Sequence, residues 1–220
     1  MSAAWAEVEG LLFDVEGTLV DSVALTLRCW QETLRENGLQ TELDTLQMLS
    51  GMDGNAMLAK LFPSLDAERR KELTAQQGER YREHYLPKVR SFPDVSNAFA
   101  ALKSKGYGLG LATDCQPDEL DHYLELTGVR SLVDAVACGA DVPNGKPAPD
   151  LVVLGMQRLK VGAAAMIGDT PFDAIAAHGG GAAAIGVKTG GFGEGALRKA
   201  GCAEVLSSVA AIPAVIPRRM

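Results

Sequence analysis

The amino-acid sequence combines short apolar runs with longer segments in which apolar residues recur at helical spacing. The run Gly10-Leu11-Leu12-Phe13 ends at Asp14 and predicts a buried strand with a polar carboxyl end. From Ser22 to Leu34 the apolar period is helical instead, with Ser22 placed to cap the helix and Gly38 to end it. The first forty residues therefore predict a strand followed by a helix.

Two kinds of pattern follow along the chain. Further helices are predicted over residues 43–49, 55–62 and 66–85, and no strand pattern lies between Asp21 and Lys88. After Pro87 and Pro93, helices over 94–105, 118–127, 150–160 and 172–178 alternate with strands over 108–112, 132–138, 163–167 and 182–187. A last short helix and strand run through Val205. Such alternation predicts an α/β fold with a Rossmann-like parallel sheet and right-handed crossovers.

The all-helical stretch interrupts the alternating series just after the first strand. We therefore expect a core domain formed by residues 1–20 and 89–220, and a small all-α cap domain, residues 21–88, inserted into it. The hinges would lie near Val20-Asp21 and at residues 87–91. A length of 220 residues is enough for one full core and one smaller unit.

Composition and charge narrow the classes of partner. Apolar residues make up 47% of the chain and charged residues 22%, which is ordinary for a globular protein. The net charge of −7 argues against nucleic acid or an anionic membrane as a partner. A small anionic substrate is still compatible, because one metal ion and one lysine can reverse the local field.

Several features predict a cytoplasmic protein. The four cysteines are scattered without a metal-binding or disulfide pattern, which fits a reducing compartment. The N-terminal residues 1–7 lack a basic region followed by a long apolar run, so we expect no secretory signal. The apolar tail 209–216 is interrupted by Pro213 and is shorter than the roughly 20 residues that a membrane span needs.

Four polar clusters come at or just after predicted strand ends, where open parallel sheets bind their ligands. They are Asp14-Val15-Glu16-Gly17-Thr18, Thr113-Asp114, Gly145-Lys146-Pro147 and Gly168-Asp169-Thr170-Pro171-Phe172-Asp173. Each alone is compatible with a helix cap or a surface loop. Together they supply complementary chemistry for phosphoryl transfer. Two carboxylates can share Mg2+ and an aspartate can act as nucleophile, while a lysine, a hydroxyl and backbone N–H groups neutralise and bind phosphate.

These four segments also resemble, in order, the four motifs of the haloacid dehalogenase superfamily. The most similar branch is the phosphoglycolate phosphatase-like one, which carries a helical cap inserted after the first motif. The resemblance covers nearly the whole chain, including Gly190-Gly191 and the turn at Ala200-Gly201. It implies a phosphatase that forms an aspartyl-phosphate and depends on Mg2+.

The resemblance assigns a first group of residues to the metal and to proton transfer. Asp14 would be the nucleophile and a metal ligand. Glu16 would offer its backbone carbonyl to the metal and its side chain as general acid and base. Asp169 would be a further metal ligand, and Asp173 would hold the water shell of the metal.

The resemblance assigns a second group to the phosphate. Thr113 and the backbone N–H of Asp114 would hold the phosphoryl group. Lys146 would contact the phosphate, orient the nucleophile and balance its charge. Substrate specificity is expected from the cap, above all from the turn at residues 50–54.

Two residues depart from the family pattern. Family phosphatases usually have aspartate where this chain has Glu16, and the extra methylene moves the carboxyl by on the order of 1 Å, which predicts slow or narrowly specific turnover. Asp114 stands where a neutral residue is more usual, and we expect its side chain to turn away from the phosphate and cap the following helix.

The leading hypothesis is thus a Mg2+-dependent hydrolase of a small phosphorylated metabolite, acting as a monomer or homodimer. One alternative is a phosphomutase of the same branch, which would need a well-placed acid/base even more. Another is a non-catalytic phosphate-binding regulatory module, and Glu16 is the only feature of the sequence that favours it.

Overall fold

The computed structural model describes residue 5 and residues 7–219. Residues 1–4, 6 and 220 lie outside the described part, and with them most of the N-terminal segment used above to argue against a secretory signal. Within the described residues, no helix combines the length and apolar character needed to cross a membrane.

A parallel sheet of six strands forms the centre of the molecule, as the sequence predicts. The strand order is β5-β4-β1-β6-β7-β8, and every neighbouring pair is parallel. The strands are β1 (Gly10–Phe13), β4 (Gly108–Ala112), β5 (Ala135–Ala137), β6 (Ala164–Gly168), β7 (Ala183–Val187) and β8 (Glu204–Leu206). Strand β1 lies between β4 and β6, so three carboxyl ends that carry predicted site residues are adjacent.

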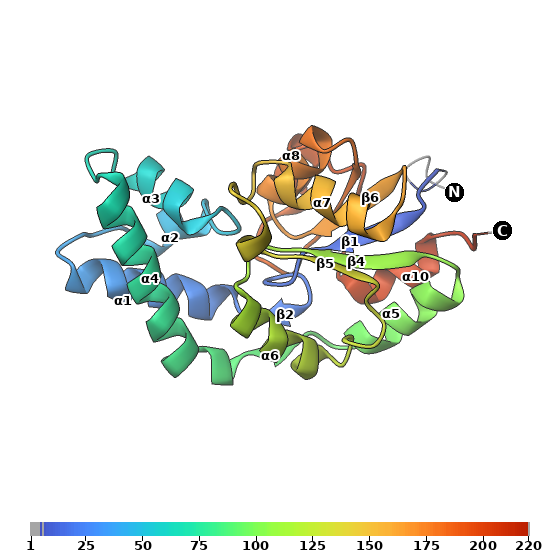
Figure 1. Ribbon diagram of the computed structural model, residues 1–220, viewed down its shortest axis with the longest axis horizontal. Coiled ribbons are helices and arrows are strands. Elements are labelled where there is room, and N and C mark those ends of the chain that lie inside the picture. Colours follow the sequence, from blue (N-terminus) through green and yellow to red (C-terminus); the bar gives the residue numbers. More distant parts are fainter. Residues whose placement is uncertain (1–4, 6, 220) are drawn as a thin grey trace.

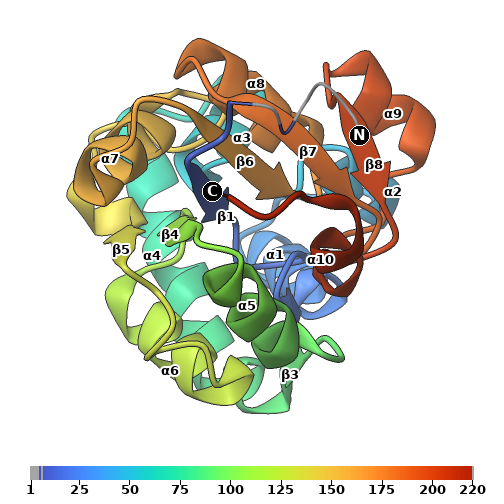
Figure 2. The same ribbon diagram turned by 90° about the vertical axis from the view of Figure 1, so that its right-hand side faces the viewer.

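Helices cover both faces of the sheet (Figure 2). One face packs against α7 (Asp150–Leu159), α8 (Pro171–Gly179) and α9 (Glu194–Lys199), and the other against α5 (Val95–Ser104), α6 (Pro117–Thr127) and α10 (Ile212–Val215). Strand β1 shows why both faces must be covered. Leu11 and Phe13 belong to one core cluster, Leu12 belongs to the other, and all three are fully buried.

Four helices lie beyond the carboxyl edge of the sheet, at the left of Figure 1. They are α1 (Val23–Glu36), α2 (Leu43–Gln47), α3 (Gly54–Leu61) and α4 (Ala67–His84), and we call residues 23–84 the helical segment. Most of its buried apolar side chains form a cluster of their own, which Phe172 of α8 joins from the rest of the chain, while Cys29 and Tyr81 belong to a core cluster of the sheet. The helical segment therefore has its own small core and touches the sheet region at the strand ends.

A two-residue antiparallel ribbon connects the helical segment to the rest of the chain. Strand β2 (Val20–Asp21) pairs with β3 (Arg90–Ser91), so the chain enters and leaves the helical segment at one place. Strands this short have no periodicity to detect, which is why the sequence did not predict the ribbon.

Two local expectations were wrong. The predicted strand over residues 132–138 shrinks to β5, because Leu132 and Val133 are held in a turn by the carbonyl of Val129. Ser22 does occupy the position before α1, but its hydroxyl makes no capping hydrogen bond and is buried without a partner. Asp53 and Asp66 do cap α3 and α4 through their side chains.

Replacing Leu12 by alanine is expected to destabilise the fold by about 2–5 kcal/mol, because it leaves a cavity between β1 and α7 at the centre of the sheet. The measurement is the free energy of unfolding in urea. Val153→Ala on α7, where the side chain is 38% exposed, is the control and should cost far less. Equal losses in the two variants would contradict this account of the core.

Candidate active site

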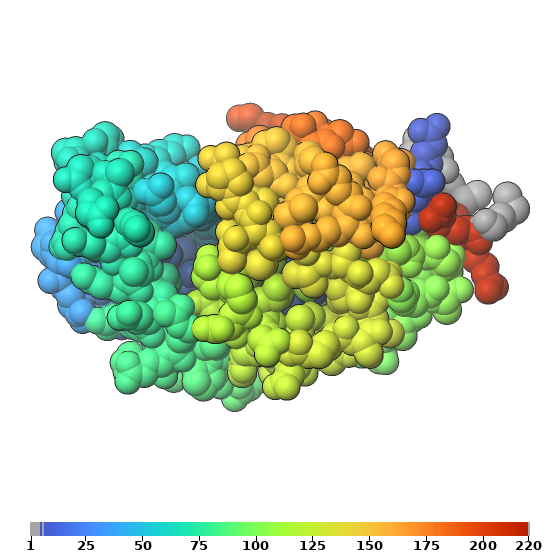
Figure 3. Space-filling view, viewed as in Figure 1, coloured from blue at the N-terminus to red at the C-terminus, as the bar shows by residue number. Residues whose placement is uncertain are grey.

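Side chains from four separate places in the sequence line one cavity of about 870 Å³. Asp14 follows β1, Thr113 follows β4, Asp169 follows β6, and Lys146 lies in the loop before α7. Because β1 neighbours both β4 and β6, these strand ends deliver their polar residues to one point. The space-filling view in Figure 3 shows the surface hollowed where the helical segment meets this edge of the sheet.

Lys146 is the central cation of the cavity and is 1% exposed. Its Nζ lies 2.8 Å from Oδ1 of Asp14 and 2.8 Å from Oδ1 of Asp173, with Oδ2 of Asp114 at 3.8 Å. Burial by itself lowers the pKa of Lys146, but the surrounding carboxylates outweigh burial and raise this pKa well above its ordinary value. The lysine is therefore held charged beside the carboxylate of Asp14.

Three buried carboxylates gather around the same point. Oxygen atoms of Asp14, Asp169 and Asp173 all lie within 4.8 Å of one another. Thr18 Oγ1 donates a hydrogen bond of 2.6 Å to Oδ1 of Asp169, whereas Oδ2 of Asp169 is buried without any partner. Burial, followed by the charges of Asp173 and Asp14, raises the pKa of Asp169 well above its usual range. An unpaired buried carboxylate oxygen beside two further carboxylates is the donor set that a hard divalent cation satisfies.

Two glycines frame the unpaired oxygen of Asp169. A Cβ at Gly190 would lie 1.6 Å from Oδ2, and one at Gly17 would lie 2.5 Å from it. Gly17 also has a φ of +74°, which favours glycine. Any larger residue at either position would fill the space next to this oxygen. In the sequence analysis Gly17 belongs to the first polar cluster and Gly190 to the family resemblance, and neither was expected to border a carboxylate.

Asp173 has both carboxylate oxygens occupied by protein donors. Oδ1 accepts from Lys146 Nζ at 2.8 Å, and Oδ2 accepts from the backbone N and Oγ1 of Thr170 at 2.9 and 2.7 Å. The Thr170–Asp173 pair forms the capping box that begins α8. Asp173 thus ties the lysine to the start of a helix.

Asp114 does not cap the helix that follows it, so that expectation was wrong. Helix α6 begins with Gln116 in a capping box with Glu119. The carboxylate of Asp114 instead accepts from the backbone N of Lys146, at 3.2 Å for Oδ1. Burial, opposed by the charge of Lys146, raises the pKa of Asp114 to about 7. The carboxylate of Asp114 therefore binds a backbone N–H of the loop that carries Lys146 instead of one at the start of α6.

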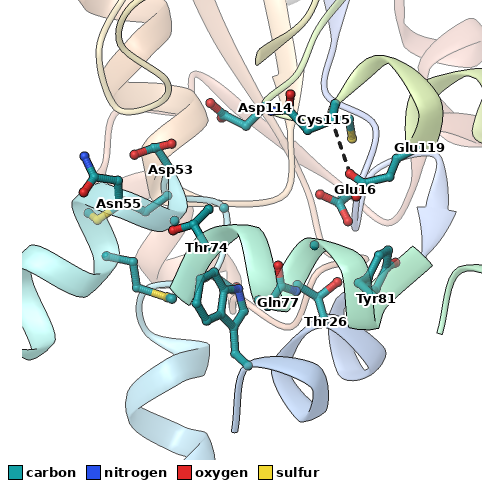
Figure 4. A pocket seen from close by; sticks show the side chains of 18 of the residues that line it. Glu16, Thr26, Asp53, Asn55, Thr74, Gln77, Tyr81, Asp114, Cys115 and Glu119 are labelled. Atoms are coloured by element: carbon teal, nitrogen blue, oxygen red, sulfur yellow. Dashed lines mark hydrogen bonds between the residues drawn. The ribbon is translucent and has the colours of Figure 1, made fainter. Parts of the chain in front are cut away.

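Thr113 and Glu16 complete the predicted set in the cavity. Thr113 is buried, and its Oγ1 accepts from the backbone N of Cys115 at 3.3 Å. The side chain of Glu16 lies beside Glu119 at one end of the cavity (Figure 4). Burial, followed by the charges of Glu119 and Asp14, raises the pKa of Glu16 to about 8.

The helical segment forms the opposite side of the cavity and contacts the strand-end loops directly. The backbone N of Asp53 donates to the carbonyl of Lys146 at 3.0 Å, and Gln47 Nε2 donates to the carbonyl of Gly190 at 3.1 Å. Gly51, at a φ of +82°, packs so tightly on Thr170 that a Cβ there would lie 2.5 Å from its methyl group. The lining that the helical segment supplies is mixed. Apolar and uncharged members include Thr26, Leu27, Trp30, Met57, Thr74 and Gln77, and charged members include Glu68, Lys71, Glu79 and Arg82.

Comparisons with known proteins agree with this geometry. A Dickeya dadantii protein named "Probable phosphatase IndB" is 33% identical over 187 residues, which is 82% of this chain and 81% of that protein. A phosphoglycolate phosphatase of Yersinia pseudotuberculosis is 28% identical over 190 residues, 83% of this chain and 82% of that protein. The crystal structure of a hydrolase from Pseudomonas syringae, 24% identical, has the same fold, with a TM-score of 0.86 over 94% of this chain and 97% of that chain.

The comparison with protein families gives the same result. Residues 11–187 match the model of the family described as haloacid dehalogenase-like hydrolase. The matched range contains all four predicted motifs and the whole helical segment. The chain therefore belongs to the haloacid dehalogenase-like hydrolases.

Proposed function

We propose that this hydrolase is a Mg2+-dependent phosphatase that cleaves the phosphomonoester of a small metabolite through an aspartyl-phosphate on Asp14. The observation that carries the proposal is the buried contact of 2.8 Å between Asp14 Oδ1 and Lys146 Nζ, next to the unpaired oxygen of Asp169. Relatives named as phosphatases, one of them a phosphoglycolate phosphatase and another a pyrophosphatase, support the same class of reaction.

The chemistry needs one nucleophile and one acid/base. A carboxylate oxygen of Asp14 attacks phosphorus, the bond to the ester oxygen breaks, and Glu16 in its protonated form supplies the proton to the leaving alcohol. Glu16 then takes a proton from water, whose oxygen attacks the aspartyl-phosphate and releases inorganic phosphate. Both residues are returned to their starting protonation states.

The other predicted residues stabilise charge during these steps. Lys146 holds the carboxylate of Asp14 in place and offsets the repulsion between it and an anionic phosphate. The Thr113 hydroxyl and the backbone N–H of Asp114 are assigned to the phosphoryl oxygens. Such preorganised donors are the main source of catalysis in phosphoryl transfer.

The residues that would hold Mg2+ are Asp14, Asp169 and the backbone carbonyl of Glu16. The bound cation would neutralise negative charge on the phosphoryl group and on these carboxylates. Asp173 would act through the water shell of the cation while it keeps Lys146 in place.

We further propose that residues 21–88 form the cap domain and that the turn at residues 50–54 selects the substrate. This turn already contacts the loop of Lys146 and the start of α8, so it is suited to exclude bulk water from the reacting groups. The four cysteines are free and buried, which supports a reducing, cytoplasmic setting.

Asp14→Asn should abolish release of inorganic phosphate from 4-nitrophenyl phosphate, because the amide is a far weaker nucleophile than the carboxylate. The measurement is steady-state phosphate release in Mg2+. Asp118→Asn, at an exposed position in α6, is the matched control and should retain the parent rate. Phosphate release by the Asp14 variant at the parent rate would end this proposal, and no release by the parent would favour the regulatory alternative.

Removing divalent cations with EDTA should stop phosphate release, and added Mg2+ should restore it. Mg2+ should also raise the melting temperature of the parent, because a ligand that binds only the folded state stabilises it. Asp169→Asn should lose most of this thermal shift as well as the activity. An equal thermal shift in parent and variant would show that Mg2+ binds elsewhere.

A further inference from the structure

A chain of two tyrosine hydroxyls leads from the helical segment to the side chain of Glu16. The Tyr123 hydroxyl lies 3.3 Å from Oε1 of Glu16, and the Tyr81 hydroxyl lies 2.7 Å from the Tyr123 hydroxyl. Tyr123 is 1% exposed and Tyr81 is 2% exposed. Figure 4 shows Tyr81 on α4 at the same end of the cavity as Glu16.

The three residues come from three different elements. Glu16 follows β1, Tyr123 lies on α6 and Tyr81 on α4, so the chain crosses from the sheet region to the helical segment. A second contact joins the same two helices, since Arg82 Nη1 of α4 lies 3.5 Å from Oε1 of Glu119 of α6. Helix α4 is therefore held against α6 at the level of Glu16.

The donors in this chain run in one direction. Each phenol has a single proton, so a Tyr123 hydroxyl that donates to Glu16 must accept the proton of Tyr81. Burial, followed by the charge of Glu16, raises the pKa of both tyrosines, and both hydroxyls therefore keep their protons. The need of buried hydroxyls for a partner explains the contact between the two tyrosines. The acceptor for the proton of Tyr123 itself is a carboxyl group in the cavity, and this choice of partner links the pair to the site.

We propose that Tyr123, itself oriented by Tyr81, is a positioning residue that fixes the Glu16 carboxyl where it serves the leaving oxygen. The inference rests on the proposed function, in which Glu16 is the acid/base. It also changes the expectation drawn from the extra methylene of glutamate. A longer side chain is misplaced only if nothing holds its end, and here a hydroxyl from α6 does.

The test compares two aryl phosphates that differ in the basicity of the leaving group. Phenyl phosphate needs a proton on its departing oxygen far more than 4-nitrophenyl phosphate does, and kcat/KM reports on that departure. Tyr123→Phe should lower kcat/KM for phenyl phosphate about ten- to a hundredfold, with a much smaller fall for 4-nitrophenyl phosphate. Equal falls with both substrates, or none, would overturn the proposal.

Tyr107→Phe is the matched control for loss of a buried hydroxyl. Tyr107 is 3% exposed and donates to the carbonyl of Pro217 at 3.2 Å, outside the cavity. Its removal should leave both substrates unaffected. Tyr81→Phe should produce the same selective fall as Tyr123→Phe, but smaller, and it provides the test if Tyr123→Phe does not fold.

A double-mutant cycle separates positioning from general packing. In a Glu16→Ala background, Tyr123→Phe should cause no further fall in kcat/KM for phenyl phosphate, because the group that it positions is gone. A fall as large as in the parent would assign Tyr123 to packing and reject the proposal. Failure of the proposed function looks different, because the parent itself would then release no phosphate from either substrate.

Glu16→Asp gives an independent readout. The shorter side chain withdraws the carboxyl from Tyr123, so kcat/KM for phenyl phosphate should fall more than for 4-nitrophenyl phosphate. An aspartate variant that matches or exceeds the parent with phenyl phosphate would show that the tyrosine contact does not place the acid/base productively.

Discussion

The burial of one lysine among carboxylates is the constraint on which the rest of the site depends. Lys146 is 1% exposed and is the close partner of both Asp14 and Asp173. Charges buried this deeply are tolerated only when they are paired, and removal of one partner leaves the others strongly destabilised. The loop before α7, the end of β1 and the start of α8 must therefore keep their relative positions to within hydrogen-bond distance.

The carboxylates in the cavity are only partly paired with positive charge or hydrogen-bond donors. One lysine interacts with four nearby carboxylates, those of Asp14, Asp114, Asp169 and Asp173, and Oδ2 of Asp169 has no donor at all. A fold optimised only for stability would have supplied a donor or an apolar residue there. The protein instead keeps two glycines around this oxygen, and so preserves space beside it. Stability is given up at this oxygen, which is where we propose that Mg2+ binds.

Much of this arrangement follows from sequence patterns, and the part that does not has a physical reason. Apolar runs that end in Asp14, Thr113 and Asp169 predict strands with polar ends, and the parallel topology then brings those ends together. The loop around Lys146 has no periodicity, and a lysine in such a loop is by itself compatible with the surface, so its place in the site follows only from the combination of the four clusters and from the family resemblance. The side chain of Asp114 binds the backbone N of Lys146, 32 residues away, rather than the start of the helix that follows it. Competition between a local cap and a distant backbone N–H is decided by tertiary packing, which residue spacing does not encode. The contact of Tyr123 with Glu16 was missed for the same reason.

The short ribbon between β2 and β3 has a consequence for how such a protein can diversify. The helical segment departs at Val20–Asp21 and returns at Arg90–Ser91, two strands that are directly paired, so its two ends are spatial neighbours. An insertion with adjoining ends places no demand on the sheet, whatever its own length or internal arrangement. The helices can be lengthened, repacked or exchanged wholesale while the strand-end residues stay where they are. The same strand-end residues can in this way be combined with different helical segments, and so with cavities of different shape.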